Sequence, residues 1–160
     1  MPPHSRLWIY QANRAFTTAE KEHLEHGLKN LCEQWAAHGT PLQTSFTLQW
    51  DQFVVLAVDE QQAGASGCSI DGSVRYLKGL QNELGLDFFD RTSVAFLSEG
   101  KITRYLLTEL KTLFNNQTLS ANTISFDNTV TSKADWEARW QTPVKNSWMA
   151  RYLPKTAVER

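Results

Sequence analysis

The sequence predicts an α+β fold: a ferredoxin-like core, in which a split βαβ antiparallel sheet carries helices on one face, and a C-terminal strand and helix extension. Residues 1–100 show the pattern order strand, helix, strand, strand, helix, strand, which is typical of that core. The apolar run from Phe53 to Val58 indicates a buried strand at its centre. A chain of 160 residues suits one domain, so we expect a single domain over 1–160, with the extension in 101–160.

The first strand and helix are predicted from residues 6–35. Residues 6–12 have an apolar centre of strand-forming types. Thr17 and Glu20 then fit a capping box, in which each side chain satisfies a backbone N–H of the first helical turn. Gly39 and Pro41 indicate where this helix has ended. Its apolar positions recur every three or four residues, as expected for one buried stripe: Leu24, Leu28, Leu31, Cys32 and Trp35.

A hairpin and a second helix follow. Residues 44–50 alternate polar and apolar types, and a turn at Asp51 leads into residues 53–58. After a loop of Gly, Ala and Ser over 63–67, helical spacing extends to Leu84, and Gly85 is expected to cap that helix. Residues 92–97 supply the next strand.

The extension is predicted to contain two strands and two helices. The strands are expected at 101–105 and 123–126, with a helix through Phe114 between them. Ser132 and Asp135 form a second capping signature, which opens a helix that Pro143 stops.

Composition narrows the function classes. The formal net charge is −1 and the cations are scattered, so a nucleic-acid partner is not expected. No apolar run approaches the roughly 20 residues of a membrane helix, so no membrane association is expected. Cys32 and Cys68 form neither a disulfide framework nor a zinc pattern. We therefore expect a cytoplasmic protein without a cofactor.

One corner of the sheet is the predicted ligand site. We expect the first and third strands to be parallel neighbours, so that the residues following them lie at one edge. Two helix N-termini, each carrying roughly +0.5 elementary charge, would then point at one spot beside an arginine, which suits an anion. The predicted ligand-binding residues are Asn13, Arg14, Asp59, Ser66, Gly67, Cys68, Ser69 and Asp71.

An alternative interpretation gives these residues a purely structural role. Arg14 would simply pair with Asp59 or Asp71, and Ser66 or Ser69 would cap the second helix. A third reading makes Cys68 a reactive thiol, because a helix N-terminus lowers a thiol pKa. A thiol nucleophile also needs a base, and His38 is expected on the far edge of the sheet.

Histidines and tryptophans allow further alternatives. His23 and His26 share the first helix with two glutamates, but no further ligands are evident, so no metal is assigned. Trp8, Trp35 and Trp50 fall on apolar faces and are expected in the core. The C-terminal aromatic residues either pack on the sheet or form a homodimer surface; they are Trp136, Trp140, Trp148 and Tyr152.

From Arg6 to about Leu153 the chain resembles a family of small uncharacterised bacterial proteins of about 160 residues. The resemblance rests on the segments 8–14, 37–39, 57–59 and 65–71, together with Trp148 and Arg151. Members are often automatically labelled as ABC transporter ATPases. This chain has no G-x-x-x-x-G-K-[ST] loop to hold nucleotide phosphates, so the resemblance implies a family but no ATPase activity.

The sequence therefore predicts a domain that binds a small anionic ligand or a protein partner without turnover. One alternative is a small enzyme acting on a phosphate or acyl-phosphate substrate, or using Cys68. Another is an assembly module that interacts through the tryptophan-rich C-terminal region.

Overall fold

The α+β class is confirmed by the computed structural model, which contains helices and antiparallel sheets of three and four strands, with a short two-stranded ladder. The chain divides into two compact units, residues 1–90 with 129–137 and residues 91–128 with 138–160. The structure describes residues 2–34, 36–37, 40–41, 43–59 and 67–153.

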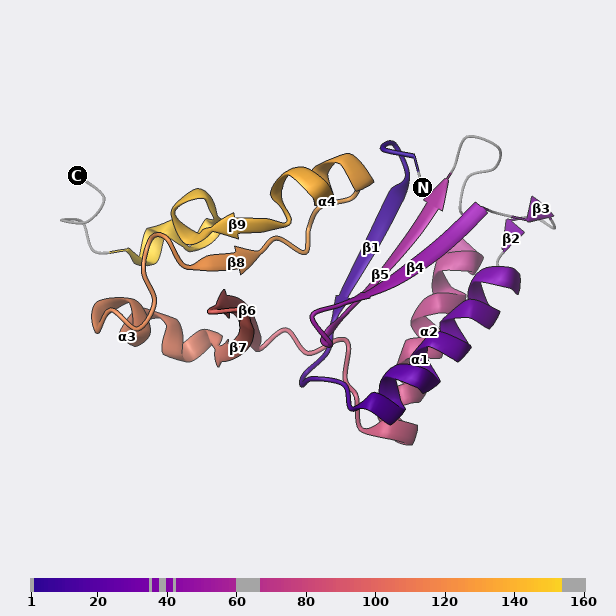
Figure 1. The fold of residues 1–160 in the computed structure, drawn as a ribbon, viewed down its shortest axis with the longest axis horizontal. Coiled ribbons are helices and arrows are strands. Elements are labelled where there is room, and N and C mark those ends of the chain that lie inside the picture. Colours follow the sequence, from indigo (N-terminus) through magenta and orange to yellow (C-terminus); the bar gives the residue numbers. More distant parts are fainter. Residues whose placement is uncertain (1, 35, 38–39, 42, 60–66, 154–160) are drawn as a thin grey trace. The chain divides into compact units, whose positions relative to one another are not determined.

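The first unit is built on a three-stranded antiparallel sheet (Figure 1), whose strand order is β1-β5-β4. The connection through α1 makes β4 parallel to β1, and the hairpin then returns β5 between them, antiparallel to both. This is the predicted split βαβ arrangement. Its elements are β1 (Arg6–Gln11), α1 (Thr18–Gln34), β2 (Ala36–Ala37), β3 (Thr40–Pro41), β4 (Gln43–Gln49), β5 (Phe53–Asp59) and α2 (Gly67–Leu84).

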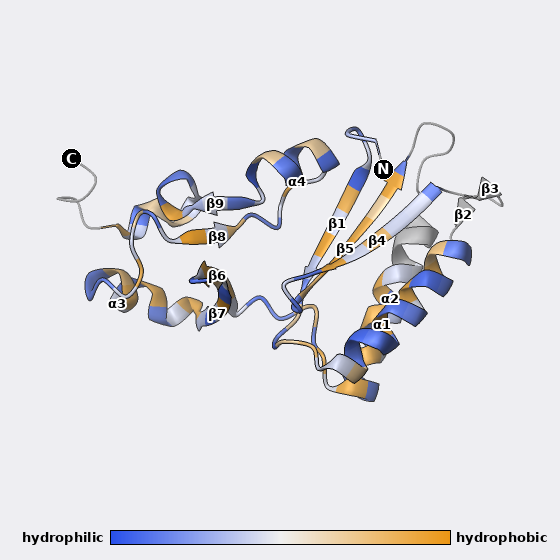
Figure 2. Ribbon diagram, in the orientation of Figure 1, coloured by the Kyte–Doolittle hydropathy of each residue, from blue (hydrophilic) through white to orange (hydrophobic). Residues whose placement is uncertain are grey.

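The central strand β5 is buried on both faces, and Figure 2 shows it hydrophobic along its length. Successive side chains of a strand point to opposite faces. Val54, Leu56 and Val58 accordingly join the main core with Leu24 of α1 and Leu77 of α2. On the other face, Val55 and Ala57 pack with Leu7, Ile9 and Trp136.

The fourth strand of the predicted ferredoxin-like sheet forms, but in the second unit. Instead of pairing with β1, β6 (Ser93–Ser98) pairs with β7 and β8. The outer edge of β1 is met by another segment, because Leu7 N donates a 2.9 Å hydrogen bond to Thr131 O. The short ladder of β2 with β3 was not predicted, and Trp35 lies outside the described residues.

The second unit holds a four-stranded antiparallel sheet of order β7-β6-β8-β9. Phe96, Leu110, Phe114 and Met149 form its main buried cluster. The strands and helices predicted for the extension are present. Besides β6, its elements are β7 (Lys101–Leu106), the 3₁₀ turn Leu107–Glu109, α3 (Leu110–Asn115), β8 (Ile124–Phe126), β9 (Gln141–Pro143) and the 3₁₀ turns Val144–Asn146 and Trp148–Tyr152. The helix α4 (Lys133–Arg139) belongs to the first unit as far as Glu137.

Local helix signals in the sequence are confirmed. Glu20 N donates to Thr17 Oγ1 at 3.1 Å and Thr17 N donates to Glu20 Oε1 at 2.9 Å, which completes the capping box. Asp135 N donates to Ser132 Oγ at the start of α4. Gly85 follows α2 with φ of +69°, the left-handed conformation that glycine adopts most easily.

The tip of the β4–β5 hairpin corrects one prediction. Trp50 and Asp51 have φ of +55° and +54°, so both lie in the left-handed region that favours Asn and Gly. Trp50 is 37% exposed in this turn, so its prediction as a core residue is wrong. Trp8 does pack against the main core.

Candidate functional site

The predicted anion corner is not assembled. Gln11 lies opposite Phe53 and Arg6 opposite Val58, so Asn13 and Arg14 follow the end of β1 that is remote from Asp59. Six residues of strand separate the two ends by about 20 Å. The expectation of parallel neighbours was wrong, because the hairpin between β4 and β5 reverses the chain once more.

Arg14 is held by its own surroundings. Its two terminal nitrogens donate to the Glu20 carboxylate at 2.7 and 2.6 Å, and Nη2 also donates to Leu84 O at 2.7 Å. These forked bonds lower the pKa of Glu20 to about 2, and the same pairing raises the pKa of Arg14. Arg14 therefore links the start of α1 to the end of α2. It forms an ion pair, as in the structural interpretation, but its partner is Glu20 and not Asp59 or Asp71.

Asn13 and Asp59 also have structural contacts. Asn13 N donates to Asp87 O at 2.9 Å, and Asp87 N returns a bond to Asn13 Oδ1 at 2.9 Å. At the opposite end of the sheet, Asp59 Oδ1 lies 3.0 Å from His4 Nε2. The two residues thus belong to different ends of the sheet.

Of the remaining predicted residues, the structure describes only the backbone of Gly67, Cys68, Ser69 and Asp71. Gly67 to Asp71 form the first turn of α2, whereas their side chains and Ser66 lie outside the described residues. Leu84 at the other end of α2 contacts Arg14. Because 18 helical residues span about 27 Å, the start of α2 is remote from Arg14. A ligand role for Ser66, Gly67, Cys68, Ser69 and Asp71 stays a prediction.

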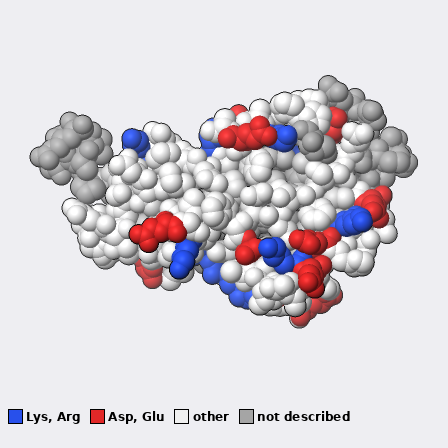
Figure 3. Space-filling model, in the orientation of Figure 1, with Lys and Arg blue, Asp and Glu red and all other residues white. Residues whose placement is uncertain are grey.

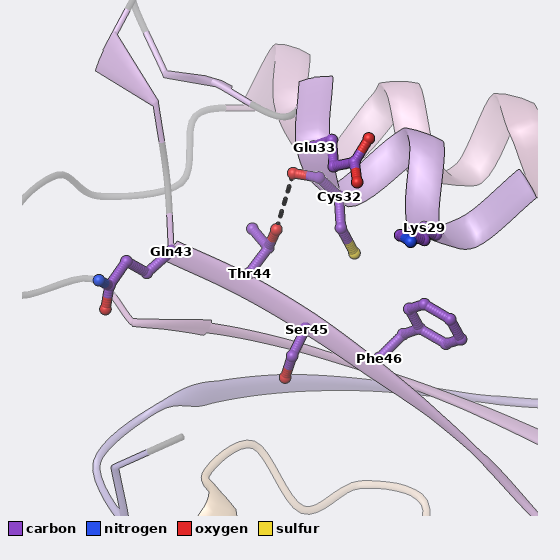
Figure 4. Close-up of a pocket in the computed structure, with 7 residues that line it drawn as sticks. All are labelled: Lys29, Cys32, Glu33, Gln43, Thr44, Ser45 and Phe46. Atoms are coloured by element: carbon purple, nitrogen blue, oxygen red, sulfur yellow. Dashed lines mark hydrogen bonds between the residues drawn. The ribbon is translucent and has the colours of Figure 1, made fainter. Parts of the chain in front are cut away.

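A pocket of about 580 Å³ lies between α1 and β4 (Figure 4), lined by Lys29, Cys32, Glu33, Gln43, Thr44, Ser45 and Phe46. Thr44 Oγ1 donates to Cys32 O at 2.9 Å, which ties the strand to the helix. Figure 4 shows the Cys32 sulfur pointing from α1 toward β4. Burial raises the pKa of this thiol, so Cys32 is mainly protonated at neutral pH and unsuited to nucleophilic attack.

A second hollow, of about 130 Å³, lies on the other face of the same strand. Its walls come from all three strands and from the start of α4: Leu7, Ser45, Phe46, Thr47, Val55, Ala57, Lys133 and Trp136. Ser45 and Phe46 line both hollows. The two hollows therefore meet at β4, one on each side of the strand.

The outer edge of Gln43–Gln49, here called the β4 edge, differs from the other sheet edges. Among the described residues, β4 pairs only with β5. Its seven residues, QTSFTLQ, include no charge and no proline, the features that commonly keep foreign strands off an edge. By contrast, β7 carries Lys101 and Arg104, β9 is three residues long and ends in Pro143, and Thr131 bonds to the outer edge of β1.

Most C-terminal aromatic residues are packed inside their own unit. Trp140 is 3% exposed and donates to Asn128 Oδ1 at 2.9 Å. Trp136 packs against the first sheet, and Tyr152 stacks on Phe114. Only Trp148 of the four is classed as exposed, at 52%, with Arg151 above its ring. These contacts favour the packing alternative over a dimer surface made of all four.

Several ionic side chains in the described regions pair with one another, such as Lys21 with Asp51 and Arg139 with Asp127. On the face drawn in Figure 3, cationic and anionic side chains stand next to each other in several places. His23 lies 3.5 Å from Glu83, whereas His26 contacts Asn30. Among the described residues, no group of three or more His, Cys, Asp or Glu side chains is placed to hold a metal ion. In that same part of the chain, no helix combines the length and apolar character of a membrane span.

Comparison with known proteins adds no assignment: no protein-family model, curated protein or solved structure matches the chain. The family resemblance inferred from the sequence stays a prediction.

Sequence reasoning missed the β4 edge as a candidate site. The uncharged composition of residues 43–49 was readable, but its meaning depends on strand order. Edge strands commonly carry charges, prolines or bulges, so the absence of these from residues 43–49 gains meaning only once the strand is known to lie at an edge.

Proposed function

We propose that this protein is a non-catalytic binding domain that receives an extended segment of a protein partner on the β4 edge. In this mode, a peptide adds a strand to the sheet: backbone hydrogen bonds provide affinity, and alternating side chains provide specificity. The observation that carries the proposal is the uncharged edge of β4, which pairs with β5 alone among the described strands and has a hollow on each side of it.

The two hollows fit the alternation of side chains in an added strand. Successive residues of an incoming strand would point toward the α1 side and the opposite side in turn. The larger hollow offers Phe46 and the Cys32 thiol beside Lys29 and Glu33, whereas the smaller one has walls such as Val55 and Trp136. A segment that alternates large apolar side chains with small ones would suit them.

The anion-binding alternative has less support. Arg14 donates its hydrogen bonds to Glu20 and to Leu84 O. The start of α2, which the predicted site also requires, is remote from Arg14. The proposal therefore retains the protein partner and the absence of turnover from the sequence-based expectation. The cytoplasm stays the expected compartment on the ground of composition alone.

A displayed library of random peptides, selected against the full chain, tests the proposal. A selected peptide should bind wild-type protein and lose at least about tenfold affinity, or about 1.4 kcal/mol, in Ser45→Lys. Ser45 is exposed and lines both hollows, so a lysine there both blocks the groove and charges the edge.

Thr103→Lys is the matched control, because Thr103 is exposed on β7, an edge that already carries charge. It should leave the affinity unchanged. Selected peptides that bind Ser45→Lys as tightly as wild type, or a library that yields no binder, would contradict the proposal.

A further inference from the structure

We propose that the segment received by the β4 edge is β4 of a second copy of this chain, related by a two-fold axis through the level of Phe46. This inference rests on the proposed function and names its partner. The two sheets would join into one antiparallel sheet of six strands. A two-fold interface requires a surface that is complementary to itself, and the β4 edge has that property.

The sequence of β4 is close to a palindrome of residue types about its centre. With Phe46 opposite Phe46 of the other copy, Gln43 meets Gln49, Thr44 meets Leu48, and Ser45 meets Thr47. Aromatic pairs and hydroxyl pairs directly across strands are favourable, and no like charges meet. This centre also lets all seven residues pair, which a displaced axis would not.

The two faces of the sheet also match in this register. Residues directly opposite in an antiparallel pair point to the same face. Phe46 and Leu48 lie on the face that packs against the helices, whereas Ser45 and Thr47 lie beside Ala57 and Val55 on the other. The helices of both copies would therefore cover one face of the joined sheet, and each smaller hollow would adjoin the seam.

Helix α1 presents charges of both signs to the same seam. Glu25, Lys29 and Glu33 follow one another at intervals of four, so they lie in one row on the helix surface. Lys29 and Glu33 of this row line the larger hollow. A cation and an anion of each copy would therefore lie in the hollow beside the joined strands.

Sedimentation equilibrium of the full chain, and of variants that introduce charges at facing positions of the two β4 strands, tests this inference. Wild-type protein should form a dimer whose population rises with concentration. Ser45→Lys alone and Thr47→Glu alone should each weaken dimerisation at least about tenfold. The double variant Ser45→Lys/Thr47→Glu should recover most of it, because the register places position 45 opposite position 47 and creates two Lys–Glu pairs.

Circular dichroism of each variant establishes that it is folded, and Thr103→Lys should dimerise like wild type. A monomeric wild type, a dimer indifferent to the single variants, or a double variant as weak as either single one would overturn the second copy as occupant. If selected peptides still bind wild type and lose affinity in Ser45→Lys, the proposed function stands without this inference. If the selected peptides do not bind wild type, or bind Ser45→Lys equally well, the proposed function fails together with this inference.

Discussion

Two regions of the first unit, the Arg14 end of the sheet and the β4 edge, use their polar groups in opposite ways. At the Arg14 end, which comprises Asn13, Arg14, Glu20, Leu84 and Asp87, donors and acceptors satisfy one another. At the β4 edge, the backbone of a seven-residue strand pairs with described residues on one side only.

Arg14 belongs to a residue type that often binds ligands, but its hydrogen bonds are internal, whereas the β4 edge has an ordinary composition and an outer side where no described strand lies. An arginine near two helix termini attracts attention in a sequence, yet here it links α1 to α2. An uncharged run of Gln, Thr and Ser attracts none, yet it occupies an edge whose outward N–H and C=O groups pair with no strand in the described part of the chain. Availability, more than the residue types themselves, is the basis of the proposed binding surface.

Removal of the Arg14 side chain should have the largest effect on folding. Arg14→Ala loses the forked bonds to Glu20 and the bond to Leu84 O, so we expect about 2 kcal/mol of destabilisation, a figure moderated by the 39% exposure of the arginine side chain. Urea denaturation measures it. Arg14→Lys keeps the positive charge but loses the paired hydrogen bonds of the guanidinium, so it should recover only part of the lost free energy of unfolding. A loss below about 0.5 kcal/mol would contradict the structural role of Arg14.

The Arg14 end should also give a pH-dependent contribution. The pKa of Glu20 is lowered from 4.5 to about 2, so its stabilisation is complete above about pH 4.5 and is lost as the pH falls toward 2. The free energy of unfolding of wild type should exceed that of Glu20→Gln by about 1–2 kcal/mol at pH 6, and this difference should vanish near pH 2. Denaturation across this pH range checks it. A difference independent of pH would show that the carboxylate charge is not the cause.

The hairpin tip closes the same end of the sheet at a conformational cost. Asp51 O accepts from Phe16 N at 2.6 Å and Gln52 O accepts from Ala12 N at 2.7 Å, which holds Trp50 in the left-handed region. Trp50→Asn should therefore stabilise the protein by about 0.5–1 kcal/mol, since Asn adopts this conformation more easily. Thermal melting compares it with Trp50→Ala, which should bring no such gain. Equal melting temperatures for both variants would argue against strain at the tip.

The smallest effect on folding is expected at the β4 edge. Ser45→Lys changes an exposed side chain, so the free energy of unfolding of the monomer should stay within about 0.5 kcal/mol of wild type. Denaturation at low protein concentration checks this value. A large loss of stability in Ser45→Lys would mean that position 45 serves folding, and that lost binding in this variant says nothing about the edge.

Local patterns carried most of the correct predictions. The capping box at Thr17 and Glu20, the glycine cap at Gly85 and the apolar run of β5 depend on neighbours in the chain, and the structure contains all three. The errors concern relations between distant segments. The direction of β5 beside β1, the placement of β6 in the second sheet and the exposure of Trp50 follow from how the hairpin and crossovers pack.

Candidate site residues depended on the same distant relations. Arg14 was correctly weighed as a structural ion pair, but Asp59 and Asp71 were the partners considered, and Glu20 holds it. Glu20 was already assigned to the helix cap, and one carboxylate serves both roles, since Oε1 accepts from Thr17 N and from Arg14. The β4 edge was not predicted at all, because an edge is defined only once every strand has its neighbours.

Amide hydrogen exchange of residues 43–49 tests the central claim most directly. In dilute protein, the amides of β4 that face away from β5 should exchange quickly, while the alternate amides paired with β5 are protected. Raising the protein concentration, or adding a selected peptide, should then protect the outward-facing amides and leave those of β7 unchanged. Outward-facing amides that are already protected in dilute protein, or that never gain protection, would contradict the account.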